Sequence, residues 1–182
     1  DFAFRLFNSV NESLGQEEQI VISPLSVSFA LSMLANGANE NTLNEILNTL
    51  DFKDFTINEM NEYNRKFIKE FGELDKTSVL ETVICVWVAK SFSILDSYQR
   101  ALEEAYQAEV KTADFSSVST LKEINEWCSE KTNGRIPDFM DYLAPASKLI
   151  LLNALYFNGV WESPFKKENT KSDLFSTSTG EQ

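Results

Sequence analysis

The chain has 182 residues, a net charge of −12 at pH 7 and 43% hydrophobic residues, so its size and composition fit one packed domain. Its pI of about 4.5 argues against nucleic acid and anionic membranes as partners, because both are bound by clustered Lys and Arg. The absence of histidine excludes Ser-His-Asp and Cys-His catalysis, and the common zinc sites, within this chain.

Two cysteines, Cys85 and Cys128, are too few for a disulfide scaffold, and we expect them to be small buried thiols. No apolar run approaches the roughly 20 residues of a membrane-spanning helix. The first ten residues carry apolar side chains at helical spacing rather than a signal peptide. We therefore expect that any targeting segment has been removed or lies outside this sequence.

Residues 21–39, VISPLSVSFALSMLANGAN, predict a buried helix over 24–36. Ser23 is the expected N-cap, with Pro24 at the first helical position. Gly37 is expected to end the helix in the left-handed conformation. Hydroxyls interrupt this apolar helix at Ser26, Ser28 and Ser32. Each needs a hydrogen-bond partner if it is buried, so their presence calls for an explanation.

The remaining pattern predicts an α+β fold. Further helices are expected at residues 2–13, 43–50, 56–71, 95–107 and 120–132, with another turn or two over 137–143. Strands are expected at 20–22, 78–90, 109–115 and 149–157, and an alternating edge strand in the tail 169–182. Capping boxes are predicted at 56–59 and 120–123. The two long strands are apolar on both faces and need neighbours on both edges, so we expect further chain to complete the sheet.

Basic residues at Arg65, Lys66 and Lys69 raise the alternative of a polyanion site. Glutamates are interspersed among them on the same predicted helix. A solvated face of mixed charge is therefore the preferred interpretation.

Three stretches together resemble the serpin family: residues 21–46, residues 123–140, and LILLNALYFNGVWESPF at 149–165. The resemblance implies a serpin-like multi-domain fold, with helices packed on a large central β-sheet. Residues 1–182 would form the N-terminal half of a single serpin domain. The family's helices A to F and strands s2A, s1A, s3A and s4C would be present, in that strand order. Strand s5A, the reactive-centre loop and most of sheets B and C would lie outside this chain.

The resemblance also implies site residues. The shutter, where the central sheet opens, would comprise Ser23, Pro24, Ser26 and Asn153, completed by a histidine from the absent half. Trp161 would lie buried at the breach, where the loop first enters. Packing and turn positions of the family motifs would be Asn133, Gly134, Phe157, Gly159, Pro164 and Phe165. The alternative is that Ser23 is only an N-cap, and for Ser28 and Ser32 we prefer a simple packing role. The family often has Asn at the position of Ile84, a departure that casts doubt on efficient inhibition.

The function implied is suicide inhibition of serine or cysteine proteases by insertion of the reactive loop into sheet A. On this hypothesis the chain is no enzyme, needs no cofactor and does not contain the reactive bond. Its partners would be a target protease and either a complementary C-terminal fragment or a second copy. A non-inhibitory chaperone, carrier or storage role is the alternative. An acidic enzyme or lectin-like domain using Asp51, Asp54 or Glu59 is disfavoured, because these lie on polar faces. An extracellular or secreted site is favoured over an intracellular one.

Overall fold

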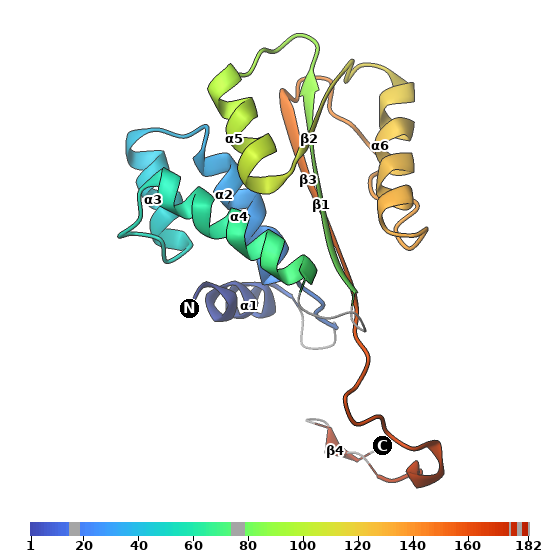
Figure 1. Ribbon diagram of the computed structural model, residues 1–182. Helices are drawn as coiled ribbons and strands as arrows, with labels where there is room; N and C mark the ends of the chain where they lie inside the picture. Colours follow the sequence, from blue (N-terminus) through green and yellow to red (C-terminus); the bar gives the residue numbers. More distant parts are fainter. Residues whose placement is uncertain (15–18, 74–78, 175, 178–179, 182) are drawn as a thin grey trace.

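The computed structural model describes residues 1–14, 19–73, 79–174, 176–177 and 180–181. Its α-helices are α1 (Phe2–Ser13), α2 (Pro24–Ala35), α3 (Glu40–Thr49), α4 (Ile57–Glu73), α5 (Asp96–Tyr106) and α6 (Val118–Lys131), and a 3₁₀ turn, η1, spans Lys167–Asn169. Its strands are β1 (Val79–Ala89), β2 (Glu109–Ala113), β3 (Leu149–Asn158), β4 (Ser176–Thr177) and β5 (Gly180–Glu181). Helices cover both faces of the main sheet, which confirms the α+β class (Figure 1).

The main sheet has three strands in the order β2-β1-β3. The central strand β1 is parallel to β2 and antiparallel to β3, with Ile84 opposite Asn153. Both long strands predicted from their apolar sequences are confirmed. Within the described ranges β3 pairs with β1 alone, so the other edge of β3 carries no strand there.

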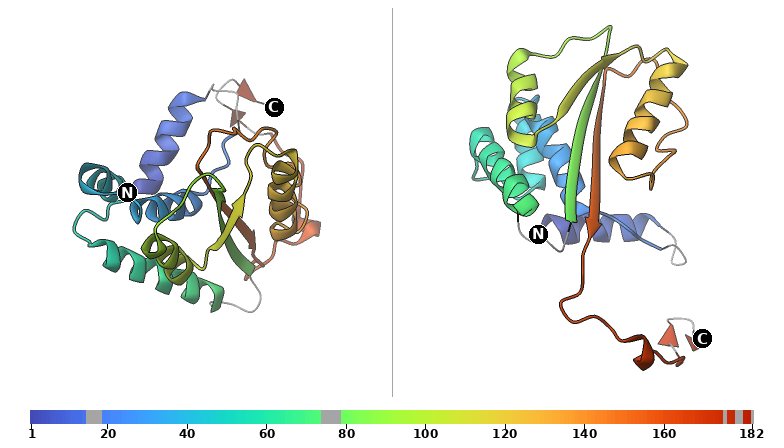
Figure 2. Two further views of the ribbon diagram at one scale, coloured as in Figure 1. Left: turned by 90° about the horizontal axis from the view of Figure 1, so that it is seen from above. Right: turned by 45° about the vertical axis from the view of Figure 1, so that its right-hand side comes forward.

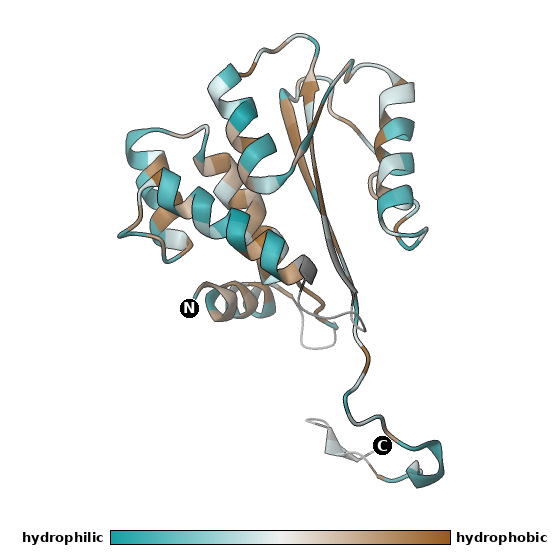
Figure 3. Cartoon of the chain, viewed as in Figure 1, coloured by the Kyte–Doolittle hydropathy of each residue, from teal (hydrophilic) through white to brown (hydrophobic). Residues whose placement is uncertain are grey.

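The sheet divides the core into two layers. On one face, Ile84 and Val86 pack against Phe29 and Met33 of α2, together with residues of α5. On the other face, side chains of all three strands pack against Ile124, Trp127 and Cys128 of α6. Figure 2 shows α6 on the side of the sheet opposite α5, and Figure 3 shows that the long strands β1 and β3 and helix α2 are rich in hydrophobic residues. A third cluster joins α2, α3 and α4.

Several predicted helix ends are confirmed. The Ser23 hydroxyl accepts a hydrogen bond from Ser26 N over 3.2 Å and caps α2. At α4, Glu59 Oε2 accepts from both the amide and the hydroxyl of Thr56, each over 2.8 Å, and forms the predicted capping box. Beyond α6, Asn133 and Gly134 have φ values of 52° and 75°, the left-handed geometry expected of a helix end.

Four predicted features are wrong. Residues 20–22 form no strand: Val21 is 94% exposed, and no described strand lies beside it. The second capping box is absent, because α6 begins at Val118 and is capped by Ser117. Residues 137–143 contain no helix. The tail 169–182 does not form one continuous edge strand: its described strands are β4 and β5, which pair with each other beyond the end of β3 (Figure 1).

Gly37 serves a different purpose from the one predicted. Its φ is not in the left-handed region; the chain continues in a tight turn in which Gly37 N donates to Leu34 O over 3.0 Å. A Cβ at Gly37 would lie 3.2 Å from Tyr98 Cε2. Glycine is therefore needed here for the close approach of α5, not for backbone conformation.

Candidate functional site: the polar groups behind the sheet

Asn153 lies in the middle of β3, the edge strand of the described sheet. It is directly opposite Ile84, which packs against α2, so the Asn153 side chain points to the α2 face. Both its Nδ2 and Oδ1 atoms are buried, and neither has a hydrogen-bond partner among the described residues. A buried amide in this condition costs about 1–3 kcal/mol, so the geometry calls for a partner.

The predicted companions of Asn153 lie at the start of α2, which packs on β3 from the same side. Ser23 uses its hydroxyl as the helix cap, while the half-buried Ser26 makes no side-chain hydrogen bond to any described residue. No hydrogen bond joins Ser26 to Asn153 in the described structure. The alternative role of Ser23 as an N-cap is thus confirmed, and the shutter assignment of these residues and Pro24 stays a prediction. Ser32 is fully buried; its hydroxyl makes no hydrogen bond of standard geometry among the described residues, but it faces the Tyr106 hydroxyl and helps to lower the pKa of that phenol.

The residues that follow β3 are more exposed than expected. Trp161 is 69% exposed and packs edge-on against Phe165, with ring centroids 5.6 Å apart. Phe157 and Phe165 are also exposed, as is Pro164. The segment leaves the sheet and no described element covers Trp161, so its burial would need residues outside this chain and its place at the breach stays a prediction (Figure 1). At Gly159 an added Cβ would lie 2.7 Å from Phe157 Cζ, so a close contact requires this glycine.

A second polar cluster, which the sequence analysis missed, joins α2, α4 and α5. The amides of Asn36 and Asn61 bond each other reciprocally, over 2.9 and 2.7 Å. Tyr106 OH donates to Asn61 Oδ1 over 2.8 Å and accepts from Asn64 Nδ2 over 3.3 Å. Burial raises the pKa of Tyr106 to about 12, against the effect of its hydrogen bonds with Asn64 and Asn36. We call these four residues the three-helix cluster.

One signal in the sequence pointed to this cluster. Asn64 falls between Met60 and Phe67 at helical spacing, within an otherwise apolar stripe of α4. A polar residue in such a stripe is expected to have a buried partner. The identity of that partner, Tyr106, depends on the packing of α4 against α5 and is not visible in the sequence.

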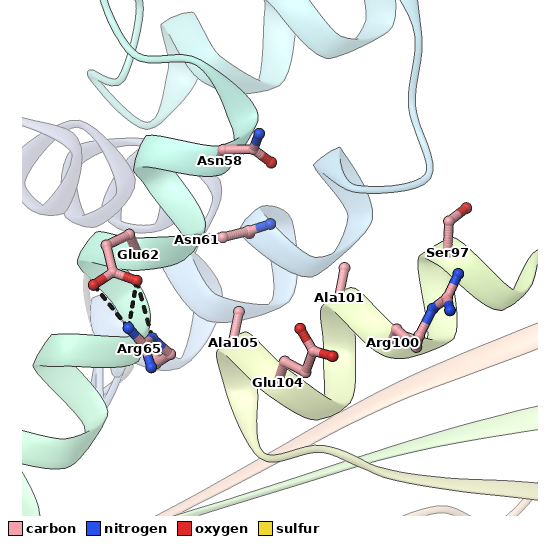
Figure 4. Close-up of a pocket in the computed structure, with 9 residues that line it drawn as sticks. All are labelled: Asn58, Asn61, Glu62, Arg65, Ser97, Arg100, Ala101, Glu104 and Ala105. Atoms are coloured by element: carbon pink, nitrogen blue, oxygen red, sulfur yellow. Dashed lines mark hydrogen bonds and ion pairs between the residues drawn. The ribbon is translucent and has the colours of Figure 1, made fainter.

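A polar groove of about 830 Å³ lies between α4 and α5, beside this cluster (Figure 4). Its charged side chains alternate in sign, and on the α4 wall Glu62 binds both Arg65, over 2.7 Å, and Lys66, over 3.7 Å. The hydrogen bonds and charge of Arg65 lower the pKa of Glu62, so this carboxylate stays ionised. Of the three basic residues considered for a polyanion site, Arg65, Lys66 and Lys69, the first two already pair with Glu62. The geometry therefore favours a solvated face of mixed charge over a polyanion site.

The thiols of Cys85 and Cys128 are both buried beneath α6 and are free. Burial raises the pKa of Cys85 to about 12 and also raises that of Cys128, so both are protonated and unreactive at neutral pH. In the described ranges no three His, Cys, Asp or Glu side chains gather as metal ligands. None of the described helices is both long and apolar enough to cross a membrane.

Comparison with known proteins accounts for this architecture. The family model described as Serpin (serine protease inhibitor) matches residues 1–182. A serine protease inhibitor of Cyanea capillata is 38% identical in an alignment of 173 positions, gaps included, that covers 92% of this chain and 45% of that protein. The leukocyte elastase inhibitor of Xenopus tropicalis is 35% identical in an alignment of 191 positions, gaps included, that covers 100% of this chain and 48% of the relative.

Solved structures agree with the sequence relatives. Ovalbumin from emu (Dromaius novaehollandiae) superposes with a TM-score of 0.90 at 25% identity, covering 100% of this chain and 51% of that one. The thermophilic serpin tengpin, in its latent state, gives a TM-score of 0.86 at 31% identity, over 100% of this chain and 49% of the other. The chain spans about half the length of the curated relatives it matches. It belongs to the serpin family.

Proposed function

We propose that the protein containing this chain is a serpin-type suicide inhibitor of serine or cysteine proteases. Its reactive loop, outside this chain, would insert as a new strand into the main sheet beside β3. Membership of the family and the inhibitor names of two relatives support this proposal. Insertion would add main-chain hydrogen bonds along β3, whose other edge carries no strand among the described residues and would pair with strand s5A, outside this chain, before the loop enters.

The observation that carries the proposal is the buried, unpartnered amide of Asn153 on that same strand. An amide whose partners change between a closed and an opened sheet helps both states to satisfy their hydrogen bonds, which apolar side chains cannot do. Ser26, half-buried and free of side-chain bonds in the described structure, is the proposed local companion of Asn153. A histidine from the rest of the protein would complete the set. Ser23 and Pro24 would fix the start of α2 behind them.

On this proposal the chain performs no chemistry itself. The protease supplies the nucleophile, cleaves the reactive loop and is trapped as an acyl-enzyme when the loop inserts. The driving free energy is the pairing and burial gained when the sheet acquires a strand, so the uninserted state is held kinetically. The residues of this chain would control the opening of the main sheet beside β3. The proposed partners are the protease and the C-terminal part of the domain.

Incubation of the full-length protein with a panel of serine and cysteine proteases tests the function. The expected result is a covalent complex that survives SDS and disappears when the protease nucleophile is blocked. Cleavage of the loop without any stable complex across the panel would contradict inhibition.

The alternative, a non-inhibitory serpin, is favoured by one specific observation. Ile84, 2% exposed, occupies the position opposite Asn153, so the neighbouring strand offers no polar partner for an opened sheet. If the lack of a polar partner at position 84 slows the opening of the sheet enough, the loop is cleaved but inserts too slowly to trap a protease. The sequence of the loop hinge distinguishes the two, because small residues there permit insertion. We also propose secretion rather than an intracellular site, which the N-terminal sequence of the full-length protein would test.

A further inference from the structure

Glu109, the first residue of β2, gathers three donors on one carboxylate. From α6, Trp127 Nε1 donates to Oε2 over 3.1 Å, and Lys131 Nζ lies 3.1 Å from Oε1. From β2 itself, Lys111 Nζ lies 3.2 Å from Oε2. A single side chain of the outermost described strand thus binds α6 at two points, one turn of the helix apart.

Two buried indoles back this carboxylate. Trp87 and Trp127 are only 3% and 4% exposed, and Lys111 Nζ lies 5.2 Å and 6.0 Å from their ring centroids. The indoles exclude water from one side of the charged groups, which strengthens the ion pairs relative to fully solvated ones. Glu109 and Lys131 remain about one-third exposed. Water can therefore solvate both charges when the contact opens, and neither charge is left buried without a partner.

Helix α6 is attached differently on its other side. Toward β3 it makes apolar contacts around Leu152, beside a small cavity of about 80 Å³ that Ile136 and Phe139 help to line. Asn125 bonds the backbone of Met140, over 2.9 and 3.0 Å, but that residue belongs to the loop after the helix. Among the described residues, every side-chain hydrogen bond and ion pair from α6 to the three strands ends on Glu109.

We propose that Glu109 is the anchor about which α6 pivots. The helix keeps its polar contacts with β2 at Glu109, while its apolar contacts with β3 break first and that side of the helix moves away from the sheet. The purpose of this anchor rests on the proposed function. A strand added beside β3 would disturb α6 and the loop that follows it, because both pack over β3. The contact at Glu109 would then guide α6 back to its original position. Glu109 is a positioning residue, since it acts through α6.

Hydrogen exchange of the full-length protein tests the anchor. Glu109→Gln keeps the size of the side chain and an acceptor for Trp127, but removes the charge that holds Lys131. We expect amides of α6 to exchange about fivefold faster, with amides of α5 unchanged, which is the size expected from losing two partly exposed ion pairs. Glu123→Gln is the matched control, because Glu123 is exposed on α6 and has no ion pair in the described structure.

A second pair of variants removes the opposite partner. Lys131→Met breaks the bridge to β2, whereas Lys122→Met breaks only an ion pair to Glu126 within α6. The thiols of Cys85 and Cys128 lie beneath the helix, so their labelling by a maleimide, located by peptide mass, reports its opening. Faster labelling in Glu109→Gln and Lys131→Met, but not in the two controls, is the expected result.

Equal exchange in Glu109→Gln and wild type, or equal acceleration in Glu123→Gln, would overturn the anchor. These readouts need no protease, so their outcome is separate from that of the inhibition assay. A protein that forms protease complexes normally but shows no effect of Glu109 on α6 refutes the anchor alone. A protein that shows the effect but traps no protease refutes the inhibitor proposal and keeps the anchor.

Discussion

Ile84 and Asn153 face each other directly across the ladder between β1 and β3, on the side of the sheet that α2 covers. One is a fully buried hydrocarbon, and the other is an amide with no partner among the described residues. The contrast leaves Asn153 dependent on groups from outside its own strand pair. A polar substitution at position 84 would therefore test directly whether the Asn153 amide lacks a hydrogen-bond partner.

A double-mutant cycle on Ile84 and Asn153 measures the coupling free energy between the two side chains. Ile84→Asn is expected to cost about 2–4 kcal/mol of unfolding free energy through lost packing. A new bond between the two amides should offset about 1 kcal/mol of that cost. The substitution should therefore cost about 1 kcal/mol more in an Asn153→Ala background, measured by denaturant unfolding of the full-length protein. Strict additivity would show that the two amides do not meet.

Removal of the Tyr106 hydroxyl should weaken the three-helix cluster. Tyr106→Phe leaves the Asn61 and Asn64 amides without their shared partner, at an expected cost of about 1–3 kcal/mol. Tyr63→Phe is the control, because Tyr63 is 51% exposed and makes no side-chain hydrogen bond in the described structure. A loss below about 0.5 kcal/mol for Tyr106→Phe would be ordinary for a surface change and would contradict the cluster's role.

The same tyrosine gives a prediction at alkaline pH. Its pKa is raised to about 12 by burial, from an ordinary value of 10.0, so the folded state retains the phenol proton longer than the unfolded state does. Its contribution to stability is therefore complete below pH 10 and is lost as the pH rises toward about 12. Burial also raises the pKa of Tyr98, so ultraviolet titration should show more than one late-ionising phenol in the wild type, and one fewer in Tyr106→Phe. Titration of every phenol near its ordinary pKa would contradict the burial of this group.

The two turn glycines should respond to alanine for different reasons. Gly37→Ala forces a contact with Tyr98 and should cost about 1–3 kcal/mol, a cost that Tyr98→Leu should partly relieve. Gly134→Ala has open space but a φ of 75°, so its cost of about 1 kcal/mol should not depend on Tyr98. Thermal unfolding of the single and double variants separates these effects. Independence of Gly37→Ala from residue 98 would show that space is not the constraint there.

Acid should release α6 through Glu109. Burial raises the pKa of this carboxyl, but hydrogen bonds from Lys131 and Trp127 and the charge of Lys111 outweigh it, so the pKa lies below the ordinary 4.5. The folded state thus binds the proton more weakly than the unfolded state. The stabilisation is present above about pH 4.5 and is lost as the pH falls further. Tryptophan fluorescence should change in that range in the wild type and Glu123→Gln, and not in Glu109→Gln.

The long strands could be predicted because their sequences record burial on both faces. Residues 79–89 and 149–157 are apolar at nearly every position, and the one asparagine within 149–157, Asn153, was therefore recognisable as a candidate site. Short segments failed for the opposite reason. Residues 20–22 and the tail have strand-like side chains, but a strand also needs a neighbour with free hydrogen-bonding groups. Sequence alone does not supply that neighbour.

The clusters around Tyr106 and Glu109 were not predictable from local pattern. Tyr106 and Asn61 are 45 residues apart in the chain and meet only because α4 packs against α5. Glu109 begins a strand of mixed polarity, where an acidic residue suggests a solvated face. Its role emerges from the position of α6, whose Trp127 and Lys131 reach the same carboxylate. In both cases tertiary packing, not residue spacing, creates the site.

We propose that the main sheet takes up the cleaved reactive loop as a new strand beside β3, and one measurement tests this most directly. The reactive loop of the full-length protein is cut with a protease that it does not trap, and exchange of the β3 amides is followed before and after cleavage. Strong new protection along 149–158, together with a marked rise in the unfolding temperature, is the predicted result. A cut protein whose β3 exchange and unfolding temperature match those of the intact form would contradict the account.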